Sequence, residues 1–252
     1  AKITNYRNEI WLAHGSKNEN WDPTWSRSEL SILKTDDWTN TKTLIDNSVL
    51  DPVDVVVNGN ISYVASWQDG LAVLVDNELS VLFNETNSSL QKRYPHNDWL
   101  NVGEIKFDSE GNLWCTNPQT LEPLSVQYTN GEWESFSLGN NVTEAQNLAK
   151  LMIDVNDQKW IQLKNNGLIV FDESRTGTKA KKISNGESNG DLNSDRVFAM
   201  AEDLDGEVWI GTDNGVSVFY NPAEIFDGEQ ASNIIVSEGE YNTYLLDGLL
   251  IN

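Results

Sequence analysis

The side chains that most often act in catalysis or bind metals are rare in this chain of 252 residues. It contains two histidines, His14 and His96, and one cysteine, Cys115. A metal triad or a Ser-His-Asp arrangement would need one of these distant histidines, and we expect His14 to be a partly buried structural residue. Cys115 directly follows Trp114 in an apolar stretch, and a nucleophilic thiolate would need a neighbouring base. We therefore predict that the protein is not an enzyme, with no catalytic residues, no metal site and no cofactor.

Acidic side chains are abundant, but their number makes them uninformative about chemistry. Asp and Glu total 39 against 17 Lys and Arg, which gives a formal net charge of −22. A glycosidase needs two carboxylates at a suitable separation, and among so many acids some pair always qualifies. The stretch from Asp203 to Gly206 could begin a calcium loop, but it lacks the further oxygen ligands at fixed positions. We interpret it as a turn whose aspartate accepts backbone hydrogen bonds.

Charge and hydropathy argue against two classes of partner. Nucleic-acid binding depends on a basic surface that neutralises phosphates, and a net charge of −22 opposes it. The longest apolar runs, such as residues 55–57 and 249–251, are far too short to span a bilayer. We predict no nucleic-acid partner and no membrane-spanning segment.

Aromatic and basic residues in two long segments are better candidates for a binding site. Most of the ten tryptophans belong to a sequence repeat, but three lie outside it. The candidate ligand- or partner-binding residues are Trp21, Trp25, Lys92, Arg93, Tyr94, His96 and Trp99. Lys92 and Arg93 form a rare basic spot on an acidic chain, where an anionic sugar could dock. The alternative is that these aromatic side chains only pack their own loops against the protein.

The repeat indicates the elements that must position these residues. Residues 203–219 contain an Asp-Gly turn, an alternating apolar run, an Asn-Gly turn and a second alternating run, which is typical of β-hairpins. Related stretches recur upstream, each with an aromatic residue in the same place. These anchors are Trp11, Tyr63, Trp114, Trp160 and Trp209, spaced by 52, 51, 46 and 49 residues. A period near 50 with about four short strands in each unit predicts β-propeller blades.

We predict an all-β fold, a β-propeller with four-stranded antiparallel blades. About five blade units are expected, at approximately 1–50, 51–101, 102–147, 148–194 and 195–252, as one propeller segment. The stretch before the first turn is shorter than its counterparts in the other units, which favours part of a larger propeller. Closure of five blades into a small propeller is the alternative.

The order of strands in a blade places the candidate residues together. In a four-stranded meander, the loop after the second strand and the link to the next blade emerge on the same face. Trp21 and Trp25 lie in a long insertion of the first kind, residues 14–29. The other candidates lie in a link of the second kind, residues 84–101. Because long loops on a rigid scaffold commonly carry function, we predict that this face binds the ligand or partner.

The motif Asp-x-Asp-Gly-x-x-Trp-Ile-Gly-Thr at residues 203–212 resembles the two-component-regulator propeller repeat. That repeat builds periplasmic sensor domains of hybrid histidine kinases in Bacteroidetes. The wider run 203–226, with residues 109–114 and 133–137, is similar to PorZ-like propellers of the type IX secretion system. This resemblance implies a non-enzymatic role at the outer-membrane surface, in a complex that links cargo to anionic lipopolysaccharide. It implies no individual ligand residues.

Three functions follow from these observations. The first is a non-catalytic extracytoplasmic propeller module, at the outer-membrane surface, that binds protein partners of a secretion complex or an anionic glycan such as lipopolysaccharide. The second is the periplasmic sensor domain of a hybrid two-component system, which binds an oligosaccharide. A propeller glycosidase is a distant third.

Overall fold

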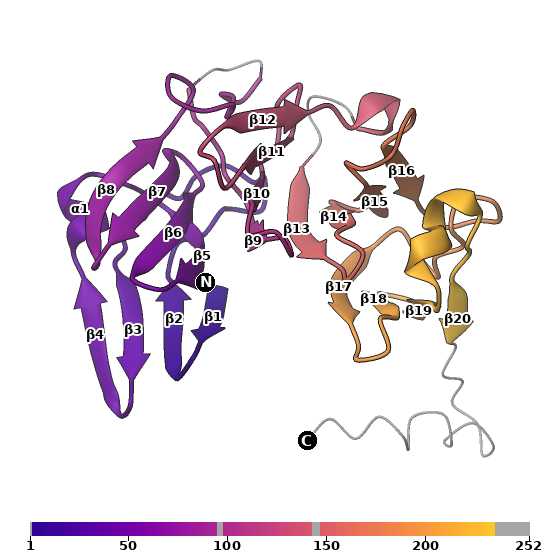
Figure 1. The fold of residues 1–252 in the computed structure, drawn as a ribbon, viewed down its shortest axis with the longest axis horizontal. Coiled ribbons are helices and arrows are strands. Elements are labelled where there is room, and N and C mark those ends of the chain that lie inside the picture. Colours follow the sequence, from indigo (N-terminus) through magenta and orange to yellow (C-terminus); the bar gives the residue numbers. More distant parts are fainter. Residues whose placement is uncertain (1, 95–97, 143–146, 235–252) are drawn as a thin grey trace. The chain divides into compact units, whose positions relative to one another are not determined.

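The computed structural model describes residues 2–94, 98–142 and 147–234, and β-strands dominate them. The strands form five four-stranded sheets, and each sheet is an antiparallel meander in chain order (Figure 1). Each predicted blade unit contains one sheet. The prediction of an all-β fold with about five four-stranded blades is therefore confirmed.

The first two sheets lie within residues 2–83. The first contains β1 (Lys2–Tyr6), β2 (Glu9–Ala13), β3 (Leu30–Lys34) and β4 (Asp37–Thr41). A short helix, α1 (Thr43–Asp46), follows it. The second contains β5 (Pro52–Asn58), β6 (Ile61–Ser66), β7 (Gly70–Val75) and β8 (Glu78–Phe83).

The remaining three sheets lie within residues 105–234. The third contains β9 (Ile105–Phe107), β10 (Leu113–Thr116), β11 (Leu124–Gln127) and β12 (Trp133–Phe136). The fourth contains β13 (Leu148–Ile153), β14 (Lys159–Leu163), β15 (Leu168–Phe171) and β16 (Ala180–Ile183). The fifth contains β17 (Val197–Glu202), β18 (Val208–Thr212), β19 (Gly215–Phe219) and β20 (Ser232–Ile234). Two 3₁₀ turns lie at Gly139–Asn141 and Pro222–Asp227.

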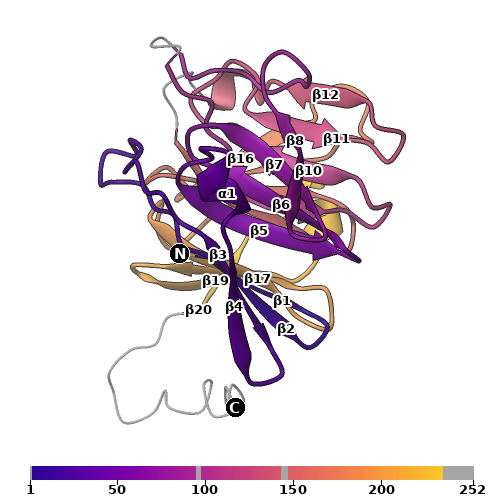
Figure 2. The same ribbon diagram turned by 90° about the vertical axis from the view of Figure 1, so that its left-hand side faces the viewer.

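The chain forms two compact units, one of residues 1–164 and 169–180 and the other of residues 165–168 and 181–252. In the first unit the innermost strand of each sheet packs on the next, from β1 to β5, β9 and β13. Apolar side chains fill the space between successive sheets, such as Trp11, Val55 and Leu74 between the first and second. Figure 2 shows these two sheets from the side. Because both faces of a sheet are covered, β7 has five buried residues in a row instead of an alternating pattern.

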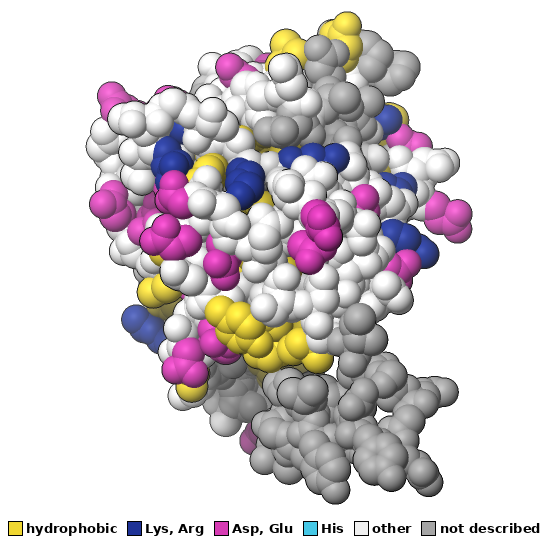
Figure 3. Space-filling model, turned by 90° about the vertical axis from the view of Figure 1, so that its right-hand side faces the viewer, with side chains coloured by type: hydrophobic (Ala, Val, Ile, Leu, Met, Phe, Trp, Pro, Cys, Tyr) yellow, Lys and Arg dark blue, Asp and Glu magenta, His cyan; other side chains and the backbone are white. Residues whose placement is uncertain are grey.

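The second unit contains the fifth sheet, on which several large apolar side chains are exposed. Phe198 and Tyr220 are 52% and 53% exposed. Figure 3 looks from the side of β20 and shows a group of hydrophobic side chains on a face where acidic and basic side chains are otherwise interspersed.

A repeated hydrogen-bond arrangement, which we call the Asp–Trp clamp, explains the sequence repeat in the third, fourth and fifth sheets. In the third sheet, one carboxylate oxygen of Asp108 accepts from the backbone N–H groups of Glu110 and Asn112, at 3.1 and 2.8 Å. The other oxygen accepts from the indole Nε1 of Trp114 at 2.8 Å. The clamp therefore closes the turn and fixes the anchor tryptophan with one side chain.

The same clamp occurs in the fourth and fifth sheets. The Nε1 atoms of Trp160 and Trp209 donate to Asp154 and Asp203, again at 2.8 Å. Asp203 also accepts from the backbone N–H groups of Asp205 and Glu207. The interpretation of this stretch as a hydrogen-bonded turn is thus confirmed.

Candidate ligand-binding face

Two long loops that are far apart in the sequence meet in the first unit. Residues 14–29 connect β2 to β3, and residues 84–104 connect β8 to β9. The guanidinium Nη1 of Arg93, in the second loop, pairs with Oδ1 of Asp22, in the first loop, at 2.7 Å. The rings of Trp25 and Trp99 meet edge to face, with centroids 6.0 Å apart. We call the surface made by these two loops the loop face.

A buried carboxylate holds the first loop in place. The fully buried Asp51 accepts hydrogen bonds from the backbone N–H groups of Thr24, Trp25 and Ser26, at 2.8–3.0 Å. The hydroxyl of Thr24 adds a fourth hydrogen bond at 2.6 Å. Nearby, the backbone N–H of Gly15 donates to the carbonyl of Pro52 at 2.6 Å. These hydrogen bonds therefore fix the backbone of the first loop at residues 15 and 24–26.

Both tryptophans of this loop have strained backbones. Trp21 and Trp25 have φ angles of 66° and 59°. A bulky residue in this left-handed region is an outlier that persists only where surrounding contacts impose it, and such outliers gather at functional sites. The Asp51 hydrogen bonds supply that constraint for Trp25. The side chain of Trp25 remains 58% exposed.

The cations of the loop face lie against aromatic rings. Arg93 lies 5.2 Å from the ring centroid of Trp99. Lys17 Nζ lies 3.3 Å from the ring centroid of Trp21 and 4.2 Å from that of Trp67. Such positions favour a cation, because the face of an indole ring is electron-rich. The loop face thus combines exposed aromatic surface with positive charge on an acidic protein.

Burial shifts the pKa of one of these cations, Lys17. It lowers the pKa of the Lys17 ammonium to about 7; the attraction of Glu104 opposes this change, and the charge of Lys164 adds to it. Lys164 Nζ itself lies 5.5 Å from the ring centroid of Trp21 and donates to the carbonyl of Glu19 at 2.9 Å.

The structure brings together four of the seven residues predicted from sequence: Trp21, Trp25, Arg93 and Trp99. Lys92 is exposed and pairs with Glu85 at 2.6 Å. Tyr94 is half-exposed, and its backbone N–H donates to the carbonyl of Gln119 at 2.8 Å. His96 lies outside the described residues. Whether the seven residues bind a ligand remains a prediction.

Four residues that lie in the first loop or contact it were not predicted from sequence: Lys17, Asp51, Trp67 and Lys164. Trp67 is fully buried, meets the ring of Trp21 at 5.8 Å and donates from Nε1 to the carbonyl of Trp21 at 2.8 Å. Its position, four residues after the anchor Tyr63, could have indicated a loop equivalent to 14–29. No local signal marks Lys164, because its contact with Glu19 spans 145 residues.

One comparison concerns the sequence repeat of the fifth sheet. A family model, the two component regulator propeller, matches residues 191–214, which span β17, the Asp203 turn and β18. The chain carries the two-component-regulator propeller repeat. Among curated proteins, none matches the chain in sequence.

Solved propeller structures share the fold. PorZ of Porphyromonas gingivalis, an essential surface component of the type IX secretion system, is 21% identical with a TM-score of 0.77; the match covers 92% of this chain and 34% of PorZ. A virginiamycin B lyase of Staphylococcus aureus is 11% identical with a TM-score of 0.63, over 95% of this chain and 71% of the lyase. The extracellular domain of the putative one component system BT4673 of B. thetaiotaomicron is 16% identical with a TM-score of 0.60, over 86% of this chain and 26% of that one. This propeller chain thus spans about a third of the length of PorZ.

The nucleophile candidates of the propeller are poorly placed for catalysis. Cys115 is fully buried, and burial raises the pKa of its thiol to about 12. Nε2 of His14 lies 2.7 Å from Oγ of Ser31, but Ser31 donates its hydroxyl proton to Asn40 at 2.7 Å. The imidazole therefore donates to Ser31 and does not activate it. His14 is exposed, which corrects the expectation of a partly buried residue: its ring forms a solvent-exposed hydrogen bond with Ser31 on β3.

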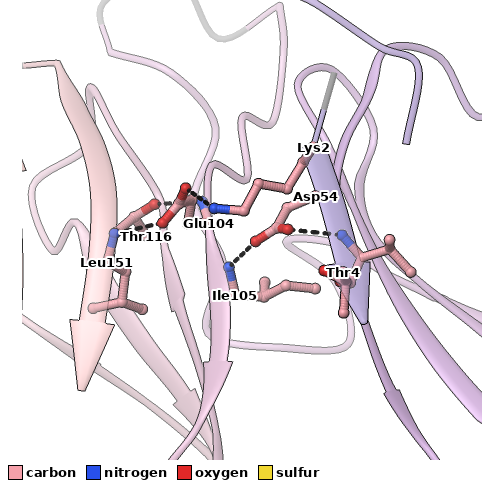
Figure 4. Close-up of polar contacts among 8 residues, drawn as sticks. Lys2, Thr4, Asp54, Glu104, Ile105, Thr116 and Leu151 are labelled. Atoms are coloured by element: carbon pink, nitrogen blue, oxygen red, sulfur yellow. Dashed lines mark hydrogen bonds and ion pairs between the residues drawn. The ribbon is translucent and has the colours of Figure 1, made fainter. Parts of the chain in front are cut away.

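A separate polar cluster joins the inner strands (Figure 4). Glu104 pairs with Lys2 at 2.6 Å and accepts from the backbone N–H of Leu151 at 2.8 Å. Asp54 accepts from the backbone N–H of Ile105 at 3.0 Å, and burial raises the pKa of Asp54 to about 6. Within residues 2–94, 98–142 and 147–234, no group of three His, Cys, Asp or Glu side chains is arranged to hold a metal ion. No helix in the described part of the chain is long and apolar enough to cross a membrane.

Proposed function

We propose that this propeller is a non-catalytic extracytoplasmic module whose loop face binds an anionic glycan. The contact between the exposed Trp25 and the half-buried Trp99, beside Arg93, is the observation that carries the proposal. Aromatic rings offer the apolar faces on which sugar rings stack, and a cation beside them selects an acidic sugar. Because Asp51 fixes residues 24–26 of the first loop, this part of the site needs little ordering when the glycan binds.

The similarity to PorZ supports a place at the outer-membrane surface. The solved PorZ is described as an essential bacterial surface component of the type IX secretion system. Lipopolysaccharide is an anionic glycan of that surface, and protein partners of such a complex are the second class of ligand for the loop face. The periplasm is the alternative location.

The sensor domain of a hybrid two-component system is a second candidate function. The match to the regulator propeller repeat and the similarity to the extracellular domain of BT4673 favour it. In that case the loop face would bind an oligosaccharide, and binding would be passed on by a further domain.

Two observations support the non-catalytic part of the proposal. The ring of His14 donates to Ser31 and does not activate it, and the thiol of Cys115 is buried. The similarity to a lyase does not oppose it, because a similarity at 11% identity shows a shared fold, and a shared fold does not imply a shared activity. In that lyase, replacement of one histidine by alanine gives a catalytically inactive protein.

A binding assay with fragments of anionic lipopolysaccharide tests the proposal, with reducing sugar measured in the same samples. We expect binding without sugar release. Trp25→Ala and Trp99→Ala should each weaken binding at least about tenfold, a loss of about 1.4 kcal/mol. Trp38→Ala is the matched control, because Trp38 is 55% exposed but lies on the outer strand β4. Sugar release would overturn the non-catalytic function, and unchanged affinity of both loop variants would overturn the site.

A further inference from the structure

The cations of the loop face differ in whether a carboxylate neutralises them. Arg93 pairs with Asp22, and Lys92 pairs with Glu85. Within the described residues, neither Lys17 nor Lys164 forms an ion pair. Their ammonium donors are therefore still available to a ligand, and below pH 7, the approximate pKa of Lys17, both groups carry a positive charge.

The only carboxylate that attracts Lys17 appreciably within the described chain, Glu104, is engaged elsewhere. One of its oxygens pairs with Lys2, and the other accepts from the backbone of Leu151. Lys17 rests instead on the rings of Trp21 and Trp67, which stabilise a cation but accept no conventional hydrogen bond. Its three ammonium donors thus lack an oxygen acceptor in the described residues.

Lys164 reaches the same tryptophan from the fourth sheet. It uses one donor on the carbonyl of Glu19 and keeps two. Both ammonium groups lie over the ring of Trp21, Lys17 at 3.3 Å and Lys164 at 5.5 Å from the centroid. The charge of Lys164 lowers the pKa of Lys17, so the two ammonium groups repel each other, and an oxyanion bound to both would reduce that repulsion.

We propose that Lys17 and Lys164, which converge on the ring of Trp21, bind one oxyanion group of the ligand, a carboxylate, a sulfate or a phosphate. This subsite rests on the proposed function, because it names the part of the glycan that enters the loop face. Trp25 and Trp99 would hold the sugar, and the two lysines would bind its charged substituent. The ion-paired Arg93 and Lys92 would contribute less.

Sulfate is the first probe, since it keeps the same charge from pH 5 to 9 and carries no sugar. Titration at pH 6, where Lys17 is protonated, and at constant ionic strength, followed by the indole N–H signals of Trp21 and Trp67 in NMR spectra, should give a saturable change. Lys17→Met and Lys164→Met should each weaken sulfate binding at least tenfold, and Lys17→Arg should restore part of it. Lys34→Met is the control and should leave sulfate binding unchanged, because Lys34 lies at the end of β3 outside the two loops and pairs with Glu9. No saturable change, or equal affinity in Lys17→Met, overturns the subsite.

A second experiment identifies the oxyanion and separates the two proposals. Glucuronate and glucose 6-phosphate carry a carboxylate and a phosphate, and glucose is the neutral control. Preference for either charged sugar over glucose, lost in Lys17→Met, supports the subsite, whereas equal binding of all three overturns it. If sulfate binds but no lipopolysaccharide fragment does, the proposed function fails and the subsite stands. If the fragments bind equally well to Lys17→Met, the subsite fails and the proposed function stands.

Discussion

Loss of the Asp–Trp clamp at Asp108 should destabilise the first unit, and the burial of Trp114 determines by how much. Asp108→Ala removes the acceptor of two backbone N–H groups, of the Asn112 amide and of the indole of Trp114, at 2.8–3.1 Å. Trp114 is fully buried, so its indole N–H would lose its acceptor where water does not reach it. Hydrogen bonds to a charged group contribute about 1.5–3 kcal/mol each when buried, and those at the turn contribute less because water replaces them. We expect Asp108→Ala to lower the free energy of unfolding by about 3–5 kcal/mol.

A double-mutant cycle isolates the bond between the carboxylate and the indole. Asp108→Ala, Trp114→Phe and the double variant are compared by urea unfolding at pH 7, followed by far-UV circular dichroism. The coupling energy should be about 2 kcal/mol. The same cycle at Asp203 and Trp209 is the control, since the bond is also 2.8 Å long but the carboxylate is exposed to solvent, and it should give a clearly smaller coupling. Equal coupling at the two clamps would refute the argument from burial.

Three further predictions follow from single groups. The pKa of Asp54 is raised to about 6, so the carboxyl binds its proton more tightly in the folded than in the unfolded protein. The stability that this proton contributes is complete below pH 4 and is lost as pH rises through 6. The free energy of unfolding of Asp54→Asn, relative to the parent protein, should therefore rise by up to about 3 kcal/mol between pH 4 and 7, and a constant difference would contradict this. Cys115, with a thiol pKa of about 12, should react with a disulfide reagent at pH 8 only after unfolding, and rapid reaction of the folded protein would show that it is accessible. In Gly15→Ala, the new Cβ would lie 2.4 Å from backbone atoms of Asp51 and Pro52, so the loop must shift; we expect loss of glycan binding and about 2 kcal/mol of stability. The matched control is Gly211→Ala, since neither glycine has a positive φ and the nearest atom to the new Cβ at Gly211 lies 3.5 Å away, an ordinary contact.

The sequence repeat was sufficient to predict the sheets, because each hairpin is encoded by neighbouring residues. The Asn214-Gly215 turn and the alternating runs beside it are local signals, and the structure pairs Thr212 with Gly215 across that turn. The meeting of the two long loops was also predictable, since it follows from the strand order in a meander. These inferences needed no side-chain coordinates.

The chemistry of the loop face was less accessible, because it depends on which sheets stack together. Asp51 accepts hydrogen bonds from residues 25–27 positions away, and Lys164 contacts a residue 145 positions away. The sequence pattern predicts the strand that Lys164 follows, but not that its side chain contacts Glu19 in the first loop. The basic pair Lys92 and Arg93 was conspicuous in the sequence, yet both cations have carboxylate partners.

The Asp–Trp clamp has a consequence for how such chains can evolve. Each of the four hydrogen bonds that Asp108 accepts in the clamp joins residues no more than six positions apart. A duplicated gene segment of one repeat would therefore carry a complete clamp with it, and no compensating substitution in the older copies would be needed to close its turn. Deletion of a repeat would likewise leave the remaining clamps intact. Selection can thus change the number of blades in whole steps, while the loops between strands diverge toward different ligands.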